Sequence, residues 1–453
     1  MEKAARLNDM ILLCDTYSED SRKLHESFMH AGYECPVVVI DEDGFLPEGV
    51  ISVYGFFLGS FPKGKNVMGK PRYFNQITVP DYWEISGTNA GAKVNDLYRE
   101  RGRIFYANPL NKRLVRVVDW YDEKGTVRSS DHYNSRGALW GRTIFNAKGQ
   151  RVNKSYFDAD GREIIVENYV TKDIILNDAD VVKIFHSKLE FIMYFLKKAE
   201  FNQTRLFYNT LSTPFFVSEK LKPQAEKRDI LFWQEHKRED IPGNMQVILS
   251  GQANRTSEII VQNRAAYDKL IELGANPEQV HKLGYIYPFE RDNSHKLEAL
   301  ICTNSDNIEQ CEKIVTALPD MHFNIAALTE MSSKLMSMET YENVTLYPGV
   351  RTDILEELFD QCDFYFDINH ESEIVSSVYK AFLHNQLIFA FEETKHNADF
   401  VSDDNIYMAA EADEMIKDIK ELMSNRAEID ERLSKQHKAA MAEPAAAYDI
   451  FNK

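Results

Sequence analysis

The chain of 453 residues carries 53 Lys and Arg against 71 Asp and Glu, which gives a net charge of −18. This charge argues against a broad surface for nucleic acid or an anionic membrane, because such surfaces collect Lys and Arg. The hydrophobic share of 44% is that of a folded protein, and the length allows two or three domains. Five cysteines without a CxxC pair predict reduced thiols in a cytoplasmic protein, and no apolar run approaches the length of a membrane span.

The chain begins with an alternation of strand and helix. MILLCDTY is predicted to be a strand, DSRKLHESFMHAG a helix that ends at Gly32, and PVVVIDEDG a second buried strand. After residue 60 the pattern becomes irregular but stays rich in residues that favour strands. A different kind of structure is therefore expected to interrupt the first domain.

A strict repeat of twelve residues follows. Aromatic residues stand at Tyr121, Tyr133, Phe145, Phe157 and Tyr169, and Asp or Asn follows each of the first four. A glycine stands three positions after that Asp or Asn, at Gly125, Gly137, Gly149 and Gly161. This spacing predicts type I turns that each close into a bulge, and so an antiparallel meander of about five strands. Trp140, Val152 and Ile164 share one column and are expected to line one face.

The repeat segment is locally basic, with twelve Lys and Arg against eight Asp and Glu between Lys112 and Lys172. The segment is interpreted either as a solvated sheet face or as a docking surface for a partner subunit. Trp120, Tyr133 and Trp140 are candidate partner-binding residues, with sheet packing and sugar stacking as alternatives for the two tryptophans. Deleting residues 112–172 is expected to leave the flanking α/β halves folded and to abolish partner binding.

Beyond Asp173 the alternation of strand and helix returns. Strands are predicted in DIILN, TRLFYNT, DILFWQE and MQVILSG, and helices at 181–201, around 214–221 and at 256–273. Residues 283–293 read as a linker, and a long charged helix is predicted from Glu411 to Lys438. The expected organisation is an N-terminal Rossmann-like domain (1–60 and 175–287), an inserted meander (61–174), a C-terminal Rossmann-like domain (288–435) and a tail (436–453).

The C-terminal segments alternate most regularly, and their strands are apolar on both faces. Such strands, joined by helices, predict a parallel doubly wound sheet that binds ligands at its carboxyl edge. The fold class is therefore α/β and GT-B-like, with two Rossmann-like domains and an antiparallel insert. The order NVTLYPGV–RTDILEELFDQCDFYFDIN–helix–LIFAFEE resembles the nucleotide-sugar domain of retaining GT-B glycosyltransferases.

That resemblance implies two glutamates eight positions apart, the second of which chelates the ribose, and an Arg and a Lys five apart beside the diphosphate. In INHESEIVSSVYKAF, Ser372 and Lys380 stand at the glutamate positions, and Asn304 and Glu309 replace the Arg and the Lys. Glu373-Ile374-Val375 replaces the glycine-rich turn. Loss of the ribose chelate alone lowers affinity by roughly 10²–10⁴. The sequence thus indicates a retained fold and a lost donor site.

A twelve-residue meander inserted into such a fold resembles the GtfB family, the non-catalytic subunits of GtfA–GtfB O-GlcNAc transferases of the accessory Sec system. The resemblance implies that a GtfA-like partner holds UDP-GlcNAc, and that this chain stabilises the partner and binds a serine-rich repeat adhesin before export. It also implies a cytoplasmic location, with peripheral membrane association as an option. No catalytic residue, cofactor or metal ligand is expected, and no nucleic acid.

The vacated cleft is predicted to bind the acceptor through His370, Glu371, Glu373, Lys380 and Asn304. The two glutamates are interpreted as charges at a helix start, with an acid/base pair as the alternative. An ion pair of Lys380 with one of these glutamates is a further option, and His370 is interpreted as a ligand contact or a polar loop residue. Two other function classes stay open. One is an active UDP-GlcNAc-dependent GT-B transferase, and the other is a sugar- or peptide-binding scaffold.

Overall fold

The computed structural model describes residues 10–59, 69–178, 181–223 and 229–452. The chain divides into two compact units, of which the first ends at Lys282 and the second begins at Leu283. The predicted boundary between residues 60 and 61 lies outside the described residues. All five cysteines lie within the described ranges and are free thiols, and all but Cys35 are buried.

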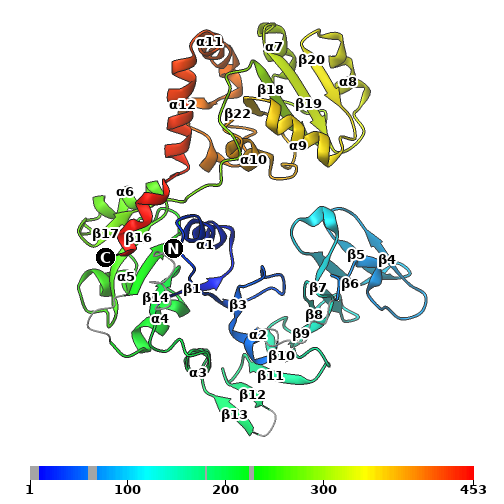
Figure 1. Ribbon diagram of the computed structural model, residues 1–453. Helices are drawn as coiled ribbons and strands as arrows, with labels where there is room; N and C mark the ends of the chain where they lie inside the picture. The colour runs from blue at the N-terminus through cyan, green and yellow to red at the C-terminus, as the bar shows by residue number, and fades with distance from the viewer. Residues whose placement is uncertain (1–9, 60–68, 179–180, 224–228, 453) are drawn as a thin grey trace. The chain divides into compact units, whose positions relative to one another are not determined.

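The first unit contains a seven-stranded parallel sheet (Figure 1). Its strand order, β17-β16-β15-β14-β1-β2-β3, is that of a Rossmann-like fold. The strands are β1 (Met10–Thr16), β2 (Val37–Asp41), β3 (Ile51–Ser52), β14 (Arg205–Tyr208), β15 (Asp229–Trp233), β16 (Thr256–Val261) and β17 (Val280–Lys282). The helices are α1 (Glu19–His30), α2 (Val53–Phe57), α3 (Lys188–Lys198), α4 (Thr213–Lys220), α5 (Gly243–Leu249) and α6 (Arg264–Glu272).

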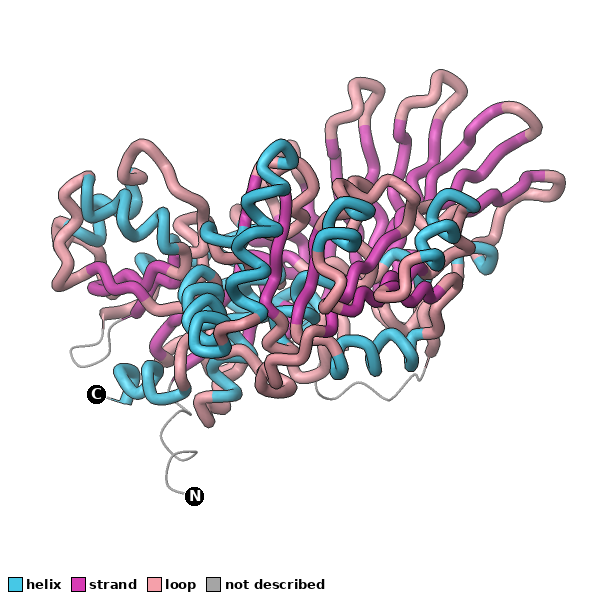
Figure 2. Tube along the Cα trace, turned by 90° about the horizontal axis from the view of Figure 1, so that it is seen from above, coloured by secondary structure: helices cyan, strands magenta, loops and turns pink. Residues whose placement is uncertain are grey.

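A ten-stranded antiparallel sheet, in chain order from β4 to β13, is inserted into this unit (Figure 2). Its strands are β4 (Trp83–Gly87), β5 (Ala92–Asp96), β6 (Arg99–Tyr106), β7 (Val115–Tyr121), β8 (Val127–Tyr133), β9 (Leu139–Phe145), β10 (Arg151–Phe157), β11 (Glu163–Asn168), β12 (Ile174–Asp178) and β13 (Val181–Phe185). The sheet has more strands than the five predicted, because β4–β6 and β12–β13 pair onto the repeat without sharing its sequence pattern.

The repeat turns have the predicted geometry. In each turn the Asp or Asn side chain accepts backbone N–H groups two and four positions on, as Asp122 does from Lys124 (2.8 Å) and Thr126 (2.9 Å). The glycine N–H returns to the carbonyl of the Asp or Asn, and the four glycines have φ between 73° and 79°. The pairing register shifts at the end of the strands, as at Trp120/Tyr121. The predicted bulges are therefore confirmed.

The inserted sheet shares its core with the α/β part of the first unit. Trp140, Tyr156 and Ile165 belong to the same buried cluster as the parallel strands and α3. The rings of Tyr54 and Tyr156 stack with centroids 4.5 Å apart. The expectation that residues 112–172 can be deleted without unfolding the N-terminal half is therefore wrong, because the deletion removes part of its core.

The second unit contains a six-stranded parallel sheet in the Rossmann order β20-β19-β18-β21-β22-β23. The two Rossmann-like units and the antiparallel insert confirm the predicted GT-B-like fold class. The strands are β18 (Glu298–Thr303), β19 (His322–Ala327), β20 (Val344–Tyr347), β21 (Phe364–Asp367), β22 (Leu387–Phe391) and β23 (Ile406–Tyr407). The helices are α7 (Cys311–Ala317), α8 (Ser333–Met336), α9 (Thr352–Gln361), α10 (Ser377–Leu383), α11 (Ala412–Met423) and α12 (Arg426–Ala439).

Several predicted elements differ from the structure. The predicted strand MQVILSG lies in α5 as far as Leu249, and Met245 and Ile248 are buried there at helical spacing. The helices predicted at 181–201 and 256–273 each begin with a β-branched strand, and α3 and α6 start only after the caps Ser187 and Asn263. The long C-terminal helix is interrupted at Asn425, whose side chain caps α12. Helix N-caps and short β-branched runs therefore set where these helices and strands begin and end.

Candidate functional site

The candidate site lies at the carboxyl ends of β18, β21 and β22, which are neighbours in the second unit. Two loops meet there, 304–310 after β18 and 368–376 after β21. Their backbones are joined by hydrogen bonds from Glu309 N to Ile368 O (2.8 Å) and from His370 N to Asn307 O (3.1 Å). The two loops therefore hold each other at the edge where the fold places ligands.

Asn369 connects the loops through its side chain. Its Oδ1 accepts a hydrogen bond from Thr303 Oγ1 (2.9 Å). Its amide nitrogen donates to Asn304 Oδ1 (3.3 Å) and to the carbonyl of Glu371 (3.0 Å). Asn304 and Glu371 are thus brought together as predicted, but through Asn369, which the sequence analysis did not single out.

A second contact between the loops joins His370 and Glu309, with Nε2 and Oε2 2.6 Å apart. The two side chains keep 29% and 23% of their surface exposed. Glu309 stands where the resemblance to retaining transferases expects a cation beside the diphosphate. The structure therefore presents a carboxylate with a histidine partner at that position.

Lys380 forms its ion pair with Glu356 of α9. The predicted pairing with Glu371 or Glu373 is wrong, because the side chain of Lys380 extends toward α9 and not toward the loop that precedes α10. The Glu373 carboxylate accepts the backbone N–H of Val378 (2.8 Å), which confirms its interpretation as a charge at a helix start.

The partly exposed His396 and the buried Asp367 form a pair that the sequence analysis missed. Nδ1 of His396 lies 2.5 Å from Asp367 Oδ1, and Nε2 lies 2.5 Å from the carbonyl oxygen of Glu371. With Asp367 ionised, both partners can only accept, so both ring nitrogens donate and the ring is an imidazolium. The hydrogen bond to Asp367 accordingly raises the pKa of His396 to about 9. The sequence could have indicated this pair, since Asp367 ends one strand and His396 follows the next, and the carboxyl ends of neighbouring parallel strands lie close together.

The turn that replaces the glycine-rich loop keeps a glycine-like backbone. Val375 and Ser376 have φ values of 46° and 53°, in the left-handed region that L residues rarely adopt. A β-branched residue is especially unfavourable there. The turn therefore has the backbone conformation that glycine favours, while its side chains differ from those of a glycine-rich loop.

The candidate partner-binding residues of the inserted sheet serve its packing. Tyr133 and Trp140 are 8% and 5% exposed. The indole of Trp120 donates to Asp131 Oδ2 (3.0 Å), and the Lys154 ammonium lies 4.7 Å from the Trp140 ring centroid. Burial lowers the pKa of Lys154 to about 8. Sheet packing, which was the alternative for the two tryptophans, thus describes their contacts within this chain.

Exposed apolar side chains of the sheet occur elsewhere. The edge strand β13 exposes Val181, Val182 and Ile184 by 55%, 64% and 57%. Within the described ranges, no group of three or more His, Cys, Asp and Glu is arranged to hold a metal ion. None of the described helices is both long enough and apolar enough to cross a membrane.

Comparison with protein families covers most of the chain. Models of the GtfB N-terminal, middle and third domains match residues 11–57, 83–186 and 188–273. A model of the GftB/GlyA-F C-terminal domain matches residues 299–436. These four segments include the inserted sheet and the candidate site.

Two relatives are similar over nearly their whole length. Both are named UDP-N-acetylglucosamine–peptide N-acetylglucosaminyltransferase stabilizing protein GtfB. The protein of Streptococcus pneumoniae serotype 4 is 43% identical over 94% of this chain and 95% of its own length. That of Streptococcus gordonii is 40% identical over 97% of each.

A solved structure entitled GtfA/B complex bound to UDP and GlcNAc contains a chain that matches with a TM-score of 0.90 and 39% identity. The match covers 98% of this chain and 99% of that one. A complex of accessory secretory proteins 1, 2 and 3 shares the fold, at a TM-score of 0.58 and 12% identity. On the strength of the full-length relatives, the chain belongs to the GtfB family.

Proposed function

We propose that this chain is the non-catalytic subunit of a UDP-GlcNAc–peptide transferase complex. It stabilises a GtfA-like catalytic subunit and holds a serine-rich acceptor protein while the partner adds GlcNAc to Ser and Thr hydroxyls. This work takes place in the cytoplasm before export of the acceptor, and peripheral association of the complex with the membrane remains a prediction. The names of the full-length relatives support the stabilising role.

The observation that carries the non-catalytic assignment is the occupation of the donor positions. A sugar nucleotide brings two phosphates whose oxygens only accept hydrogen bonds and carry negative charge. At their expected position stands the Glu309 carboxylate, already paired with His370. At the ribose position stands Lys380, paired with Glu356. Both substitutions disfavour UDP-GlcNAc, so the chemistry is assigned to the partner subunit.

The same loops, together with Lys380 of α10, are proposed to contact the acceptor. His370 and Lys380 keep 29% and 30% of their side-chain surface exposed, and Asn304 is exposed. With Glu371 and Glu373 they offer hydrogen bonds to the amides and hydroxyls of an extended chain. Each bond contributes about 0.5–1.5 kcal/mol, so affinity depends on several repeats bound at once.

Replacing His370 and Lys380 together by Ala tests this assignment. The double variant is expected to weaken acceptor binding and to slow transfer by the assembled complex, with the complex still intact on gel filtration. Unchanged acceptor affinity, with folding verified by circular dichroism, would place acceptor binding elsewhere.

The inserted sheet is proposed to hold the catalytic partner, and its exposed edge offers the contact. An edge strand with unpaired backbone groups and aliphatic side chains is a template for another strand. Val182 and Ile184 project to the same face of β13, since they are two positions apart. Changing both to Lys should abolish co-purification of the catalytic subunit. The matched control is Val170→Lys, a 71% exposed valine outside the strands. Normal stoichiometry in the double variant would exclude the β13 edge.

A further inference from the structure

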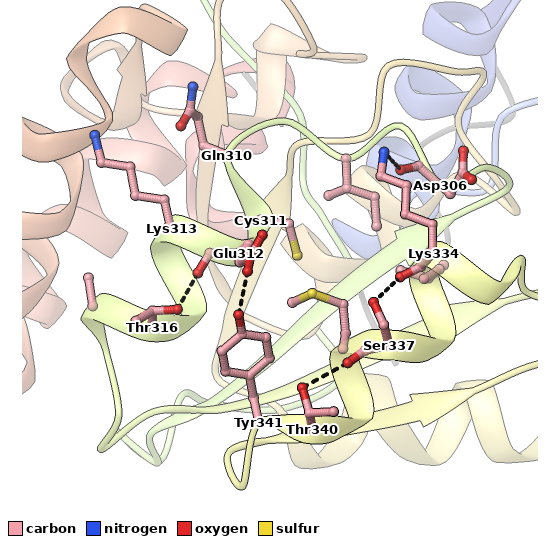
Figure 3. Close-up of a pocket in the computed structure, with 14 residues that line it drawn as sticks. Asp306, Gln310, Cys311, Glu312, Lys313, Thr316, Lys334, Ser337, Thr340 and Tyr341 are labelled. Carbon is pink, nitrogen blue, oxygen red and sulfur yellow. Dashed lines mark hydrogen bonds between the residues drawn. The ribbon is translucent and has the colours of Figure 1, made fainter.

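A cavity of 880 Å³ lies beside the candidate site, between α7 and the segment formed by α8 and the 3-10 turn Ser337–Thr340 (Figure 3). Buried Cys311, Leu335 and Met338 form its apolar floor. Loop 304–310 separates the two places, because Asp306 and Ile308 line the cavity while Asn304 and Glu309 contact the 368–376 loop.

Three hydroxyl groups that line the cavity donate their hydrogens to backbone carbonyls of the protein, which leaves their oxygen lone pairs for a ligand. Thr316 Oγ1 donates to the carbonyl of Glu312 (2.7 Å), Ser337 Oγ to that of Lys334 (2.6 Å) and Thr340 Oγ1 to that of Ser337 (2.9 Å). A hydroxyl has a single hydrogen, so while these bonds are kept each group offers a ligand an acceptor. Both helical walls of the cavity therefore offer acceptors.

The charged groups of the cavity are engaged with the protein itself. Lys334 donates to the backbone carbonyl of Asp306 (3.1 Å), and Lys313 pairs with Asp413 (2.8 Å). The Tyr341 hydroxyl donates to Glu312 Oε1 (2.6 Å), as Figure 3 shows. The carboxylates of Asp306 and Glu312 and the ammonium groups of Lys313 and Lys334 all line the space, so its charged groups sum to zero. Walls without net charge that offer both donors and acceptors favour an uncharged ligand that also carries both.

We propose that this cavity binds a segment of the hydroxyl-rich acceptor polypeptide, an inference that rests on the proposed function. Backbone N–H groups and Ser or Thr hydroxyls can donate to the hydroxyls of the walls, backbone carbonyls can accept from the lysines, and small side chains pack on the apolar floor. The volume lies near the upper end of the roughly 300–1,000 Å³ of ligand pockets, which leaves room for several small residues. A chain bound here lies across loop 304–310 from His370.

The test compares two tryptophan variants of the full-length protein. Ser337→Trp places an indole in the cavity, whereas Glu339→Trp places one on the same 3-10 turn at an exposed position that does not line it. Binding of a fluorescein-labelled peptide of alternating Ser and Ala is followed by anisotropy. Ser337→Trp is expected to weaken binding about tenfold or more, and Glu339→Trp to leave it within about twofold, with equal melting temperatures.

A substitution that keeps the side-chain shape tests the hydrogen bonding separately from the filling of the cavity. Thr316→Val removes an acceptor without adding volume and is expected to weaken peptide binding about threefold. Equal binding by the Ser337 and Glu339 variants would overturn the cavity assignment while leaving the proposed function intact. Displacement of the peptide by UDP or by free GlcNAc would overturn the ligand class. If the unaltered protein stabilised its partner but bound no peptide, both this inference and the acceptor-binding half of the proposed function would fail.

Discussion

The repeat turns of the inserted sheet and the turn at 373–376 both contain residues with positive φ. The sheet places glycines there, with φ between 73° and 79°, whereas the C-terminal unit places Val375 and Ser376 there, at 46° and 53°. Glycine adopts positive φ with little strain, because it has no Cβ. Val375 and Ser376 have a Cβ, so the same conformation strains the backbone there.

The two kinds of turn also differ in what holds them. In the sheet, the Asp122 side chain and backbone close the turn through contacts within four positions. In the C-terminal unit, the loop is held by His396, which binds the Glu371 carbonyl and Asp367. A self-contained turn can repeat along a chain. A turn held by a cation from a distant part of the chain needs a site that the fold has assembled.

The largest expected effect comes from removing that cation. His396→Ala leaves the Asp367 carboxylate, 2% exposed, without its charged partner, and should lower the free energy of unfolding by about 3 kcal/mol. The matched control, His370→Ala, breaks a partly exposed pair and should cost less than about 1 kcal/mol. Urea unfolding at pH 6 measures both, and equal losses would show that the pair of His396 and Asp367 does not hold the loop.

The same pair predicts a pH dependence. The pKa of His396 rises from its ordinary 6.5 to about 9 on folding, so its stabilisation is complete below pH 6.5 and is lost as the pH rises through 9. The rise corresponds to about 3 kcal/mol. The stability difference between the unaltered protein and His396→Ala should therefore shrink between pH 6.5 and 9. A difference that stays constant over this range would contradict the imidazolium assignment.

Two alanine substitutions separate backbone strain from packing in the repeat. A Cβ on Gly149 would meet no described atom within 4 Å, whereas one on Gly137 would lie 2.4 Å from the carbonyl oxygen of Lys70. Gly149→Ala should cost about 1 kcal/mol of stability through its left-handed backbone alone. Gly137→Ala should cost about 2–3 kcal/mol, because the contacting backbone must also move. Equal thermal shifts of the two variants would disprove this difference.

The smallest effect is expected at the strained turn. Val375→Gly relieves the left-handed conformation of a β-branched residue but increases the entropy of the unfolded chain. Relief of the strain should outweigh the entropy effect, so Val375→Gly should raise the free energy of unfolding by a few tenths to about 1 kcal/mol. Gly149→Ala is the reverse change in the self-contained turn. A loss of stability in Val375→Gly would mean that packing of the valine outweighs its strain.

Features fixed by neighbouring residues could be predicted from the sequence. The turn at Asp122 and Gly125 needs only five residues, and the apolar strands of the C-terminal unit identify its parallel sheet. The partners of Lys380 and Asp367 could not be predicted in this way, since Glu356 and His396 lie 24 and 29 positions away. Those contacts depend on which strands are neighbours. Strands β4–β6 lie within the predicted insert, but their bounds could not be predicted because they lack the repeat.

The central claim is that this chain keeps the fold of a sugar-nucleotide enzyme but not its donor site. Calorimetric titration of the isolated protein with UDP-GlcNAc tests it most directly, with the catalytic subunit as the positive control. The closed contacts of Glu309 with His370 and of Lys380 with Glu356 predict no binding in the low-micromolar range. A low-micromolar dissociation constant for the isolated chain would contradict the account.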